Sequence, residues 1–317
     1  MMNDHQNKGI ISCIGNTPLV RLNRLFNKFP VELYAKLEMF NPGGSIKDRT
    51  AYNILQNAMN KGLIHSATTI IESTSGNMGI GLARVCHFLG LKLILVTDPH
   101  INEITVSILK TFNAKVITVN QHDGKGGYLN TRLQKVQQLL TEIPDSFWPD
   151  QYHNKDNPLA HEQTFLEITN ALGKNPDYIF VSTSTCGTLR GLADAIEKHN
   201  ATTKIIAVDA KGSVIFGDKP QKRMIPGMGA SRLSDFLRID QVDQVQLITD
   251  KETIKGCHHL LKTESILAGG SSGAIVKAIE KTISCFPKDT TIVAIFADNG
   301  ERYLKTIYSE ESVQQHF

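Results

Sequence analysis

Closely spaced cysteines and long apolar runs are both missing from this 317-residue sequence. The five cysteines, at positions 13, 86, 186, 257 and 285, form no CxxC pair, so the sequence indicates neither a disulfide framework nor a metal site. The longest apolar runs, such as Leu91–Val96, have the length of a strand and fall far short of the roughly 20 residues that span a bilayer. The first residues, Met1–Asp4, show no signal-peptide pattern. We therefore expect a cytoplasmic protein in a reducing compartment.

An excess of charge of either sign is also missing. The chain carries 34 Lys and Arg against 31 Asp and Glu, a net charge of +3. So small a charge suggests neither a nucleic-acid nor a membrane partner, and a bound phosphate or a multiply anionic small-molecule substrate would fit it no worse. Hydrophobic residues make up 41% of the chain, an ordinary share for a globular protein, and the length allows two packed lobes.

Short apolar strands and helices alternate along most of the chain. Strands are predicted at Val31–Leu37, Thr69–Glu72, Leu91–Asp98, Lys115–Val119, Tyr178–Thr183, Ile205–Asp209 and Thr291–Phe296. Helices are predicted at Ser45–Asn60, Met78–Leu89, Ile104–Asn113, Tyr128–Glu142, Leu189–Lys198 and Ile266–Cys285. This alternation predicts an α/β fold with parallel-rich sheets flanked by helices, and the Pro- and Asp-rich break at Ile143–Asp150 suggests two lobes with a cleft between them.

Two segments place reactive or polar groups where a predicted helix begins. In Asn41–Arg49, a glycine turn puts Lys47 in the first helical turn, where the positive helix end lowers the pKa of an amine and favours attack on an aldehyde. The alternative is an ordinary surface lysine. In Glu72–Gly79, three hydroxyl residues and two glycines open a helix, an arrangement suited to binding a carboxylate. The alternative there is simple helix capping.

Two further segments have the same strand–turn–helix form. Ser184–Thr188 follows a strand and offers backbone N–H and hydroxyl groups, which suits a phosphate. Ala268–Ala274 is a small-residue turn in which the Ser271 hydroxyl is available to a ring nitrogen. A capped turn and a flexible loop are the respective alternatives.

In this order, the four segments resemble the cysteine synthase family of fold-type II pyridoxal-phosphate (PLP) enzymes. The resemblance runs from Ile14–Leu19 to Ser271–Gly273, nearly the whole chain. It implies a fold like that of the tryptophan synthase β subunit, a homodimer, and β-replacement through an aminoacrylate. It also implies a large lobe of residues 1–45 and 153–317 and a small, mobile lobe of residues 46–152.

The resemblance also implies roles for single residues. Lys47 would form the Schiff base, Asn77 would contact the phenolic oxygen of PLP, and Ser271 would contact the pyridine nitrogen. A serine there gives a mild electron sink, which favours loss of a good β leaving group. The implied phosphate ligands are Ser184, Thr185, Cys186, Gly187 and Thr188. The implied ligands of the amino-acid carboxylate are Thr74, Ser75, Asn77, Met78 and Gln151.

Three segments resemble one subfamily, which joins O-phosphoserine to L-glutamate for 2,3-diaminopropionate and siderophore (staphyloferrin B) biosynthesis. They are Gly126–Arg132, Asp209–Pro220 and Pro226–Arg232, whereas His161–Ile168 is shorter than its family counterpart and lacks its glycine. The resemblance implies a transferase that forms a carbon–nitrogen bond. Two alternatives stay open: a cysteine synthase that uses O-acetylserine or O-phosphoserine with sulfide, and an inactive paralogue that acts as a binding partner.

Three residues are candidates for the distinctive substrates of that subfamily. Arg132 and Tyr152 would bind glutamate, and Arg232 would bind a phosphate leaving group. Ser184 could face either the cofactor or glutamate. The alternative for Arg132 is a salt-bridged residue on the polar face of its helix, and for Arg232 a surface arginine.

Overall fold

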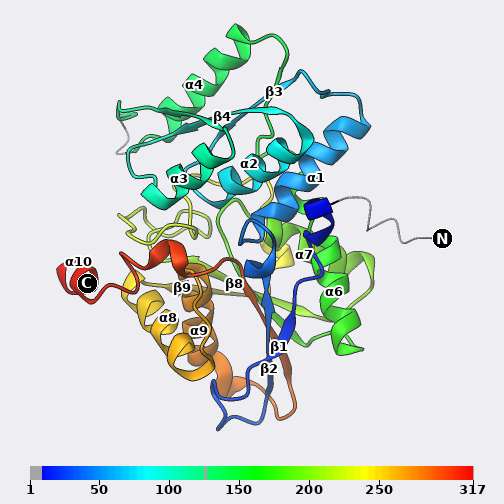
Figure 1. Cartoon of the computed structure of the whole chain (residues 1–317). Coiled ribbons are helices and arrows are strands. Elements are labelled where there is room, and N and C mark those ends of the chain that lie inside the picture. The colour runs from blue at the N-terminus through cyan, green and yellow to red at the C-terminus, as the bar shows by residue number, and fades with distance from the viewer. Residues whose placement is uncertain (1–8, 125–126, 317) are drawn as a thin grey trace. The chain divides into compact units, whose positions relative to one another are not determined.

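A computed structural model describes residues 9–124 and 127–316, which divide into two units (Figure 1). Unit 1 comprises residues 9–14 and Lys47–Asn157, and unit 2 comprises Gly15–Ile46 and the chain from Pro158. Residues 9–14 were expected in the large lobe, but Ile11 packs in the hydrophobic core of unit 1. Met1–Asp4, where no signal-peptide pattern was expected, lies outside the described residues. Gly126, the first residue of the Gly126–Arg132 segment, also lies outside them.

Unit 1 is a four-stranded parallel sheet with helices on both faces. Its strand order is β5-β4-β3-β6, with β3 at Thr69–Ser73, β4 at Lys92–Thr97, β5 at Lys115–Thr118 and β6 at Ser146–Phe147. One face packs on α1 (Lys47–Asn60), α2 (Asn77–Leu89) and α3 (Glu103–Thr111), and the other on α4 (Leu129–Glu142). Successive side chains of β3 and β4 lie on opposite faces of the sheet, and each face packs in a hydrophobic core. Both strands are therefore continuously apolar at their centres.

Unit 2 is a six-stranded sheet, also covered on both faces. Its order is β1-β2-β10-β7-β8-β9, with β1 at Leu19–Arg21, β2 at Glu32–Leu37, β7 at Tyr178–Ser182, β8 at Lys204–Ala210, β9 at Gln244–Ile248 and β10 at Thr291–Phe296. Among these described strands, β1 alone pairs antiparallel. One face packs on α6 (Glu162–Leu172) and α7 (Gly187–Lys198), and the other on α8 (Asp250–Glu264) and α9 (Gly270–Thr282).

The remaining elements are short. They are α5 (Asp156–Leu159), α10 (Glu310–His316) and the 3₁₀ turns Gly9–Cys13, Glu38–Phe40, Ile239–Gln241, Ile283–Cys285 and Glu301–Tyr303. Within the described ranges, no helix has the length and apolar character needed to cross a membrane.

The predicted α/β class with parallel-rich sheets is confirmed, and two predicted helices begin at least two residues later than expected. The helix predicted from Ser45 begins at Lys47, because Ser45 instead forms a bridge with Asp298. The helix predicted from Ile266 begins at Gly270, after the left-handed residue Ser265 ends α8. The first correction matters for function, because it makes Lys47 the first residue of α1.

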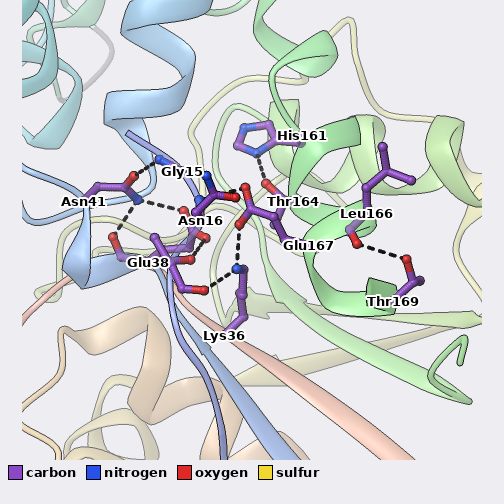
Figure 2. Close-up of polar contacts among 11 residues, drawn as sticks. Gly15, Asn16, Lys36, Glu38, Asn41, His161, Thr164, Leu166, Glu167 and Thr169 are labelled. Atoms are coloured by element: carbon purple, nitrogen blue, oxygen red, sulfur yellow. Dashed lines mark hydrogen bonds and ion pairs between the residues drawn. The ribbon is translucent and has the colours of Figure 1, made fainter. Parts of the chain in front are cut away.

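A buried lysine ties together the first part of unit 2 (Figure 2). The Lys36 side chain is 1% exposed, and its Nζ donates to the Thr17 carbonyl at 2.5 Å and to Glu167 Oε2 at 2.6 Å. The other Glu167 oxygen accepts the Asn16 N–H at 2.9 Å. Lys36 therefore fixes the Asn16–Thr17 segment, which belongs to the Ile14–Leu19 motif.

The same network continues to the turn that precedes Lys47. The Thr17 hydroxyl donates to Glu38 Oε1 at 2.7 Å, and Asn41 Nδ2 donates to Glu38 Oε2 at 2.8 Å. Asn41 Oδ1 in turn accepts the Gly15 N–H at 2.8 Å. Asn41, the first residue of the Asn41–Gly44 turn, is thus held by both its amide atoms.

Replacing Lys36 by methionine is expected to lower the free energy of unfolding by about 3–5 kcal/mol, because the Glu167 carboxylate would lose its buried cation. Urea unfolding measures the loss. The matched control is Lys61→Met, whose ion pair with Asp156 leaves the lysine 56% exposed, so its loss should stay below about 1 kcal/mol. Equal losses in the two variants would contradict a stabilising role for the buried network.

Candidate active site

Lys47 is half-buried and is the first residue of α1. The turn before it includes Gly44, whose φ of +77° favours glycine. In unit 1, α1 packs closely on α2, since a Cβ atom at Gly81 would lie 3.0 Å from the Lys47 carbonyl oxygen. The backbone of Lys47 therefore has a fixed place beside α2, the helix that the Ser73–Asn77 turn opens.

The Ser73–Asn77 turn connects β3 to α2. The Thr74 N–H donates to the Val96 carbonyl at 3.1 Å, and the Thr74 hydroxyl accepts the Gly76 N–H at 3.2 Å. Gly76 is the N-cap of α2 and no side chain caps this helix, an arrangement suited to an anion. The Ser73 hydroxyl is buried and has no hydrogen-bond partner among the described residues. These features fit a carboxylate site.

Asn77 and Met78, two of the predicted carboxylate ligands, differ in how far their side chains are buried. Asn77 is half-buried and is the first residue of α2. The Met78 side chain is buried in the hydrophobic core of unit 1, which leaves only its backbone N–H for a ligand.

Gln151 is held by its backbone and keeps its side chain available. Its carbonyl accepts Asn157 Nδ2 at 2.6 Å, and the Asn157 Oδ1 atom accepts the Thr50 hydroxyl at 3.2 Å, which links Gln151 to α1. Its backbone N–H donates to Glu72 Oε2 at 3.3 Å. Within the described ranges, no partner is seen for its side-chain amide, and the residue as a whole is 8% exposed. Tyr152 is half-buried and follows it directly.

Glu72 is a residue to which the sequence assigned no role. It is 2% exposed at the end of β3, and its Oε1 atom accepts the Ser73 N–H at 2.7 Å and Trp148 Nε1 at 3.0 Å. Burial raises the pKa of this carboxyl to about 7, and the negative charge of Asp150 acts in the same direction. Only its position directly before the hydroxyl-rich turn could have drawn attention to it.

Arg132 lies beside the same turn. Its Nη1 atom donates to the Ser75 hydroxyl at 3.2 Å and forms an ion pair with Asp98 Oδ2 at 3.1 Å. Its Nε atom is buried and has no hydrogen-bond partner in the described part of the chain. The ion pair with Asp98, which follows β4, agrees with the alternative of a salt-bridged residue, and the contact with Ser75 adds a second partner. The structure therefore brings Arg132 together with the predicted carboxylate ligand Ser75.

In unit 2, the Ser184–Thr188 turn connects β7 to α7. Cys186 is the N-cap of α7 with a left-handed φ of 61°, and no side chain caps the helix. The Thr185 hydroxyl is buried without a hydrogen-bond partner among the described residues. The Ser184 hydroxyl donates to the Gly229 carbonyl at 3.4 Å. An uncapped helix end beside an unsatisfied buried hydroxyl is suited to a bound anion.

His161 is a second residue that the sequence did not single out. It is fully buried just before α6, and its Nε2 atom lies 3.3 Å from the Thr188 hydroxyl. A Cβ atom at Gly191 would lie 2.7 Å from His161 Cβ, so the histidine packs against α7. Its place in the His161–Ile168 segment, which departs from the family pattern, was the available signal.

Ser271 lies in the first turn of α9, buried and next to the N-cap Gly269, where no side chain caps the helix. The preceding segment is held by Tyr308, whose hydroxyl donates to the Ala268 carbonyl at 2.6 Å and accepts the Ala268 N–H at 3.2 Å. Arg232 is half-buried in a separate loop of unit 2. Arg223 steadies that loop by donating from Nη1 to the Ala230 carbonyl at 2.9 Å.

Comparisons with known proteins show the family and the fold of this chain. A family model described as "pyridoxal-phosphate dependent enzyme" matches residues 10–298. The O-acetylserine dependent cystathionine β-synthase of Helicobacter pylori is 33% identical, with a TM-score of 0.88 over 95% of this chain and 98% of that chain. O-Acetylserine sulfhydrylase isoform 3 of Entamoeba histolytica is 31% identical, with a TM-score of 0.88 over 97% and 94%. An O-ureido-L-serine synthase is 28% identical, with a TM-score of 0.87 over 96% and 98%.

PLP fits the turns of unit 2. Its phosphate needs several donors, and the uncapped start of α7 together with the unsatisfied Thr185 hydroxyl supplies them. The pyridine nitrogen needs one polar partner, for which the buried Ser271 hydroxyl is suited. An aldehyde also needs an amine, a role that the family resemblance assigns to Lys47.

Proposed function

This chain belongs to the pyridoxal-phosphate-dependent enzymes of the cysteine synthase type, and on that basis we propose that it joins O-phospho-L-serine to L-glutamate. The products would be N-(2-amino-2-carboxyethyl)-L-glutamate, a precursor of 2,3-diaminopropionate for siderophores or related natural products, and phosphate. The predicted cofactor and the predicted class, a PLP-dependent β-replacement enzyme, are confirmed by the family match. The choice of the two substrates is the proposal.

Different residues of this chain would have different roles in such a reaction. When bound, PLP withdraws electrons from the α-carbon of an amino acid, so that the β-substituent can leave and a nucleophile can add. Lys47 would hold the cofactor covalently and then take the α-proton. Thr74, Ser75 and Asn77 would hold the α-carboxylate together with Gln151. The buried turn at Ser184–Thr188 would hold the cofactor phosphate.

The observation that carries the glutamate proposal is the position of Arg132. Glutamate brings two carboxylates that must be held while its amine attacks, and a carboxylate taken out of water needs charge-assisted partners. Arg132 contacts Ser75, and its buried Nε donor has no partner among the described residues. The Asp98 carboxylate offsets part of its charge, which explains how the guanidinium can lie buried without a ligand. Tyr152, next to Gln151, would supply a hydroxyl.

The principal alternative is a cysteine synthase, in which sulfide is the nucleophile. Two of the similar structures are described as acting with O-acetylserine, which favours this alternative for the first substrate. Sulfide, however, needs no cation at the Ser75 turn. An inactive binding partner is disfavoured because Lys47, Asn77 and Ser271 are all present. By family resemblance, we further propose a homodimer in the cytoplasm.

A parallel assay tests the proposal. The holoenzyme is incubated with O-phospho-L-serine or O-acetyl-L-serine, each with L-glutamate or with sulfide, and the products are identified by mass. We expect the glutamate adduct as the main product, formed faster from O-phospho-L-serine. Cysteine as the main product, with no glutamate adduct from either donor, would replace the proposal by the cysteine synthase alternative.

Arg232 is expected to favour the phosphate leaving group, because its planar fork can bind two phosphate oxygens. Arg232→Ala should lower kcat/KM for O-phospho-L-serine roughly tenfold or more and leave that for O-acetyl-L-serine within about twofold. The exposed Arg238 serves as the matched control, with Arg238→Ala leaving both values unchanged. Equal losses on the two donors would show that Arg232 has no role in recognising phosphate.

A further inference from the structure

The buried Glu72 carboxylate joins two segments that lie far apart in the sequence. Its Oε1 atom accepts the N–H of Ser73, the first residue of the Ser73–Asn77 turn, at 2.7 Å and Trp148 Nε1 at 3.0 Å. Its Oε2 atom accepts the backbone N–H of Gln151 at 3.3 Å. Both segments carry expected ligands of the substrate α-carboxylate. One side chain therefore fixes the distance between the two parts of that site.

We propose that Glu72 is a positioning residue for substrate binding, because it holds Gln151 and the Ser73–Asn77 turn at the spacing that an amino-acid carboxylate requires. The inference rests on the proposed function only in taking this turn as the carboxylate site. It does not depend on which leaving group or nucleophile the enzyme uses.

Burial of the Glu72 carboxyl costs free energy that its partners offset only in part. A carboxyl group removed from water destabilises the fold unless its partners compensate. The three N–H donors compensate in part, since the pKa of the carboxyl is still raised to about 7, and none of them belongs to a cation. What the carboxylate adds is the placement of Gln151, whose side-chain amide stays available for a ligand.

Glu72 also gives the site a dependence on pH. Its pKa is raised to about 7, chiefly by burial, and among the described residues the negative charge of Asp150 raises it further. Two donors already occupy Oε1, so a proton would go to Oε2 and weaken the bond from the Gln151 N–H. Substrate binding should therefore weaken as the pH falls through about 7.

The test is the Glu72→Gln variant of the holoenzyme. An amide nitrogen in place of one carboxylate oxygen must face an N–H donor, so at least one of the three bonds is lost. We expect KM for O-acetyl-L-serine and for O-phospho-L-serine to rise roughly tenfold or more, with kcat changed less than about threefold. The wild-type rise in KM toward low pH should disappear in the variant. The matched control is Glu142→Gln, on the exposed end of α4, which should change neither KM nor its pH profile.

A substrate analogue without a carboxylate separates positioning from general damage. O-Phosphoethanolamine lacks the α-carboxylate, so its binding, followed through the visible spectrum of the cofactor, should be equal in wild type and Glu72→Gln. Trp148→Phe keeps an aromatic ring and removes one donor to Glu72, so it should raise KM in the same direction by a smaller factor. An unchanged KM in both variants, or an equal loss for O-phosphoethanolamine, would overturn the proposal.

Failure of the proposed function has a different signature. A wild-type enzyme that makes only cysteine would refute the glutamate reaction, while the comparison of KM between wild type and Glu72→Gln with O-acetyl-L-serine would still test Glu72.

Discussion

Lys47→Ala is expected to abolish covalent attachment of PLP and to lower turnover by roughly a thousandfold, since the variant loses both the amine that holds the cofactor and the base for the α-proton. Borohydride reduction, proteolysis and mass spectrometry measure the attachment. In the wild type, the reduced cofactor should be found on the peptide that contains Lys47.

The matched control is Lys61→Ala, at the exposed region just beyond α1, which should retain cofactor and turnover. If Lys47→Ala still carries reduced cofactor on another lysine, or keeps more than about a tenth of the wild-type turnover, the assignment of Lys47 fails.

Arg132→Ala is expected to slow the glutamate-dependent half-reaction roughly tenfold to a hundredfold, since one charge-assisted hydrogen-bond pair is worth about 1.5–3 kcal/mol. Release of phosphate from O-phospho-L-serine in a single turnover should stay near the wild-type rate. Stopped-flow spectroscopy of the cofactor separates the two half-reactions. Lys135→Ala, on the same helix and bonded only to Gln138 among the described residues, is the matched control.

A second variant guards against an indirect effect of Arg132→Ala. Removing the guanidinium leaves the Asp98 carboxylate without its cation, which alone could disturb the Ser75 turn. The double variant Asp98→Asn/Arg132→Ala removes that unpaired charge. If the double variant regains the wild-type rate with glutamate, Arg132 serves only to neutralise Asp98, and the case for glutamate weakens. If it remains slow, the guanidinium binds the second substrate.

The central elements of both sheets could be predicted from the sequence, because each has a local signal. Thr291–Phe296 was predicted with the bounds that β10 has, since a strand buried on both faces is a continuous apolar run. The strands β1, β6 and β9 were missed because they are short or half-buried and have no such run. Their pairing depends on neighbouring strands that are remote in the sequence.

The residues of the candidate site also differ in whether the neighbouring sequence gives a signal for them. The turns at Ser73–Asn77 and Ser184–Thr188 carry small and hydroxyl residues at a helix start, a pattern that the sequence displays directly. Glu72 and His161 gain their roles from partners 79 and 27 positions away, so the sequence around them was not enough to assign those roles. Arg132 came from the family resemblance alone, and only the structure could connect it to Ser75 and Asp98.

The most direct test of the proposed reaction is a competition between nucleophiles with labelled glutamate. The holoenzyme receives O-phospho-L-serine with equal concentrations of sulfide and L-glutamate carrying ¹⁵N in its amine, and the products are resolved by mass. The proposed reaction predicts a main product that contains both carbon skeletons and retains the label, because the glutamate amine forms the new bond. Cysteine as the main product, with no labelled adduct above the enzyme-free control, would contradict it.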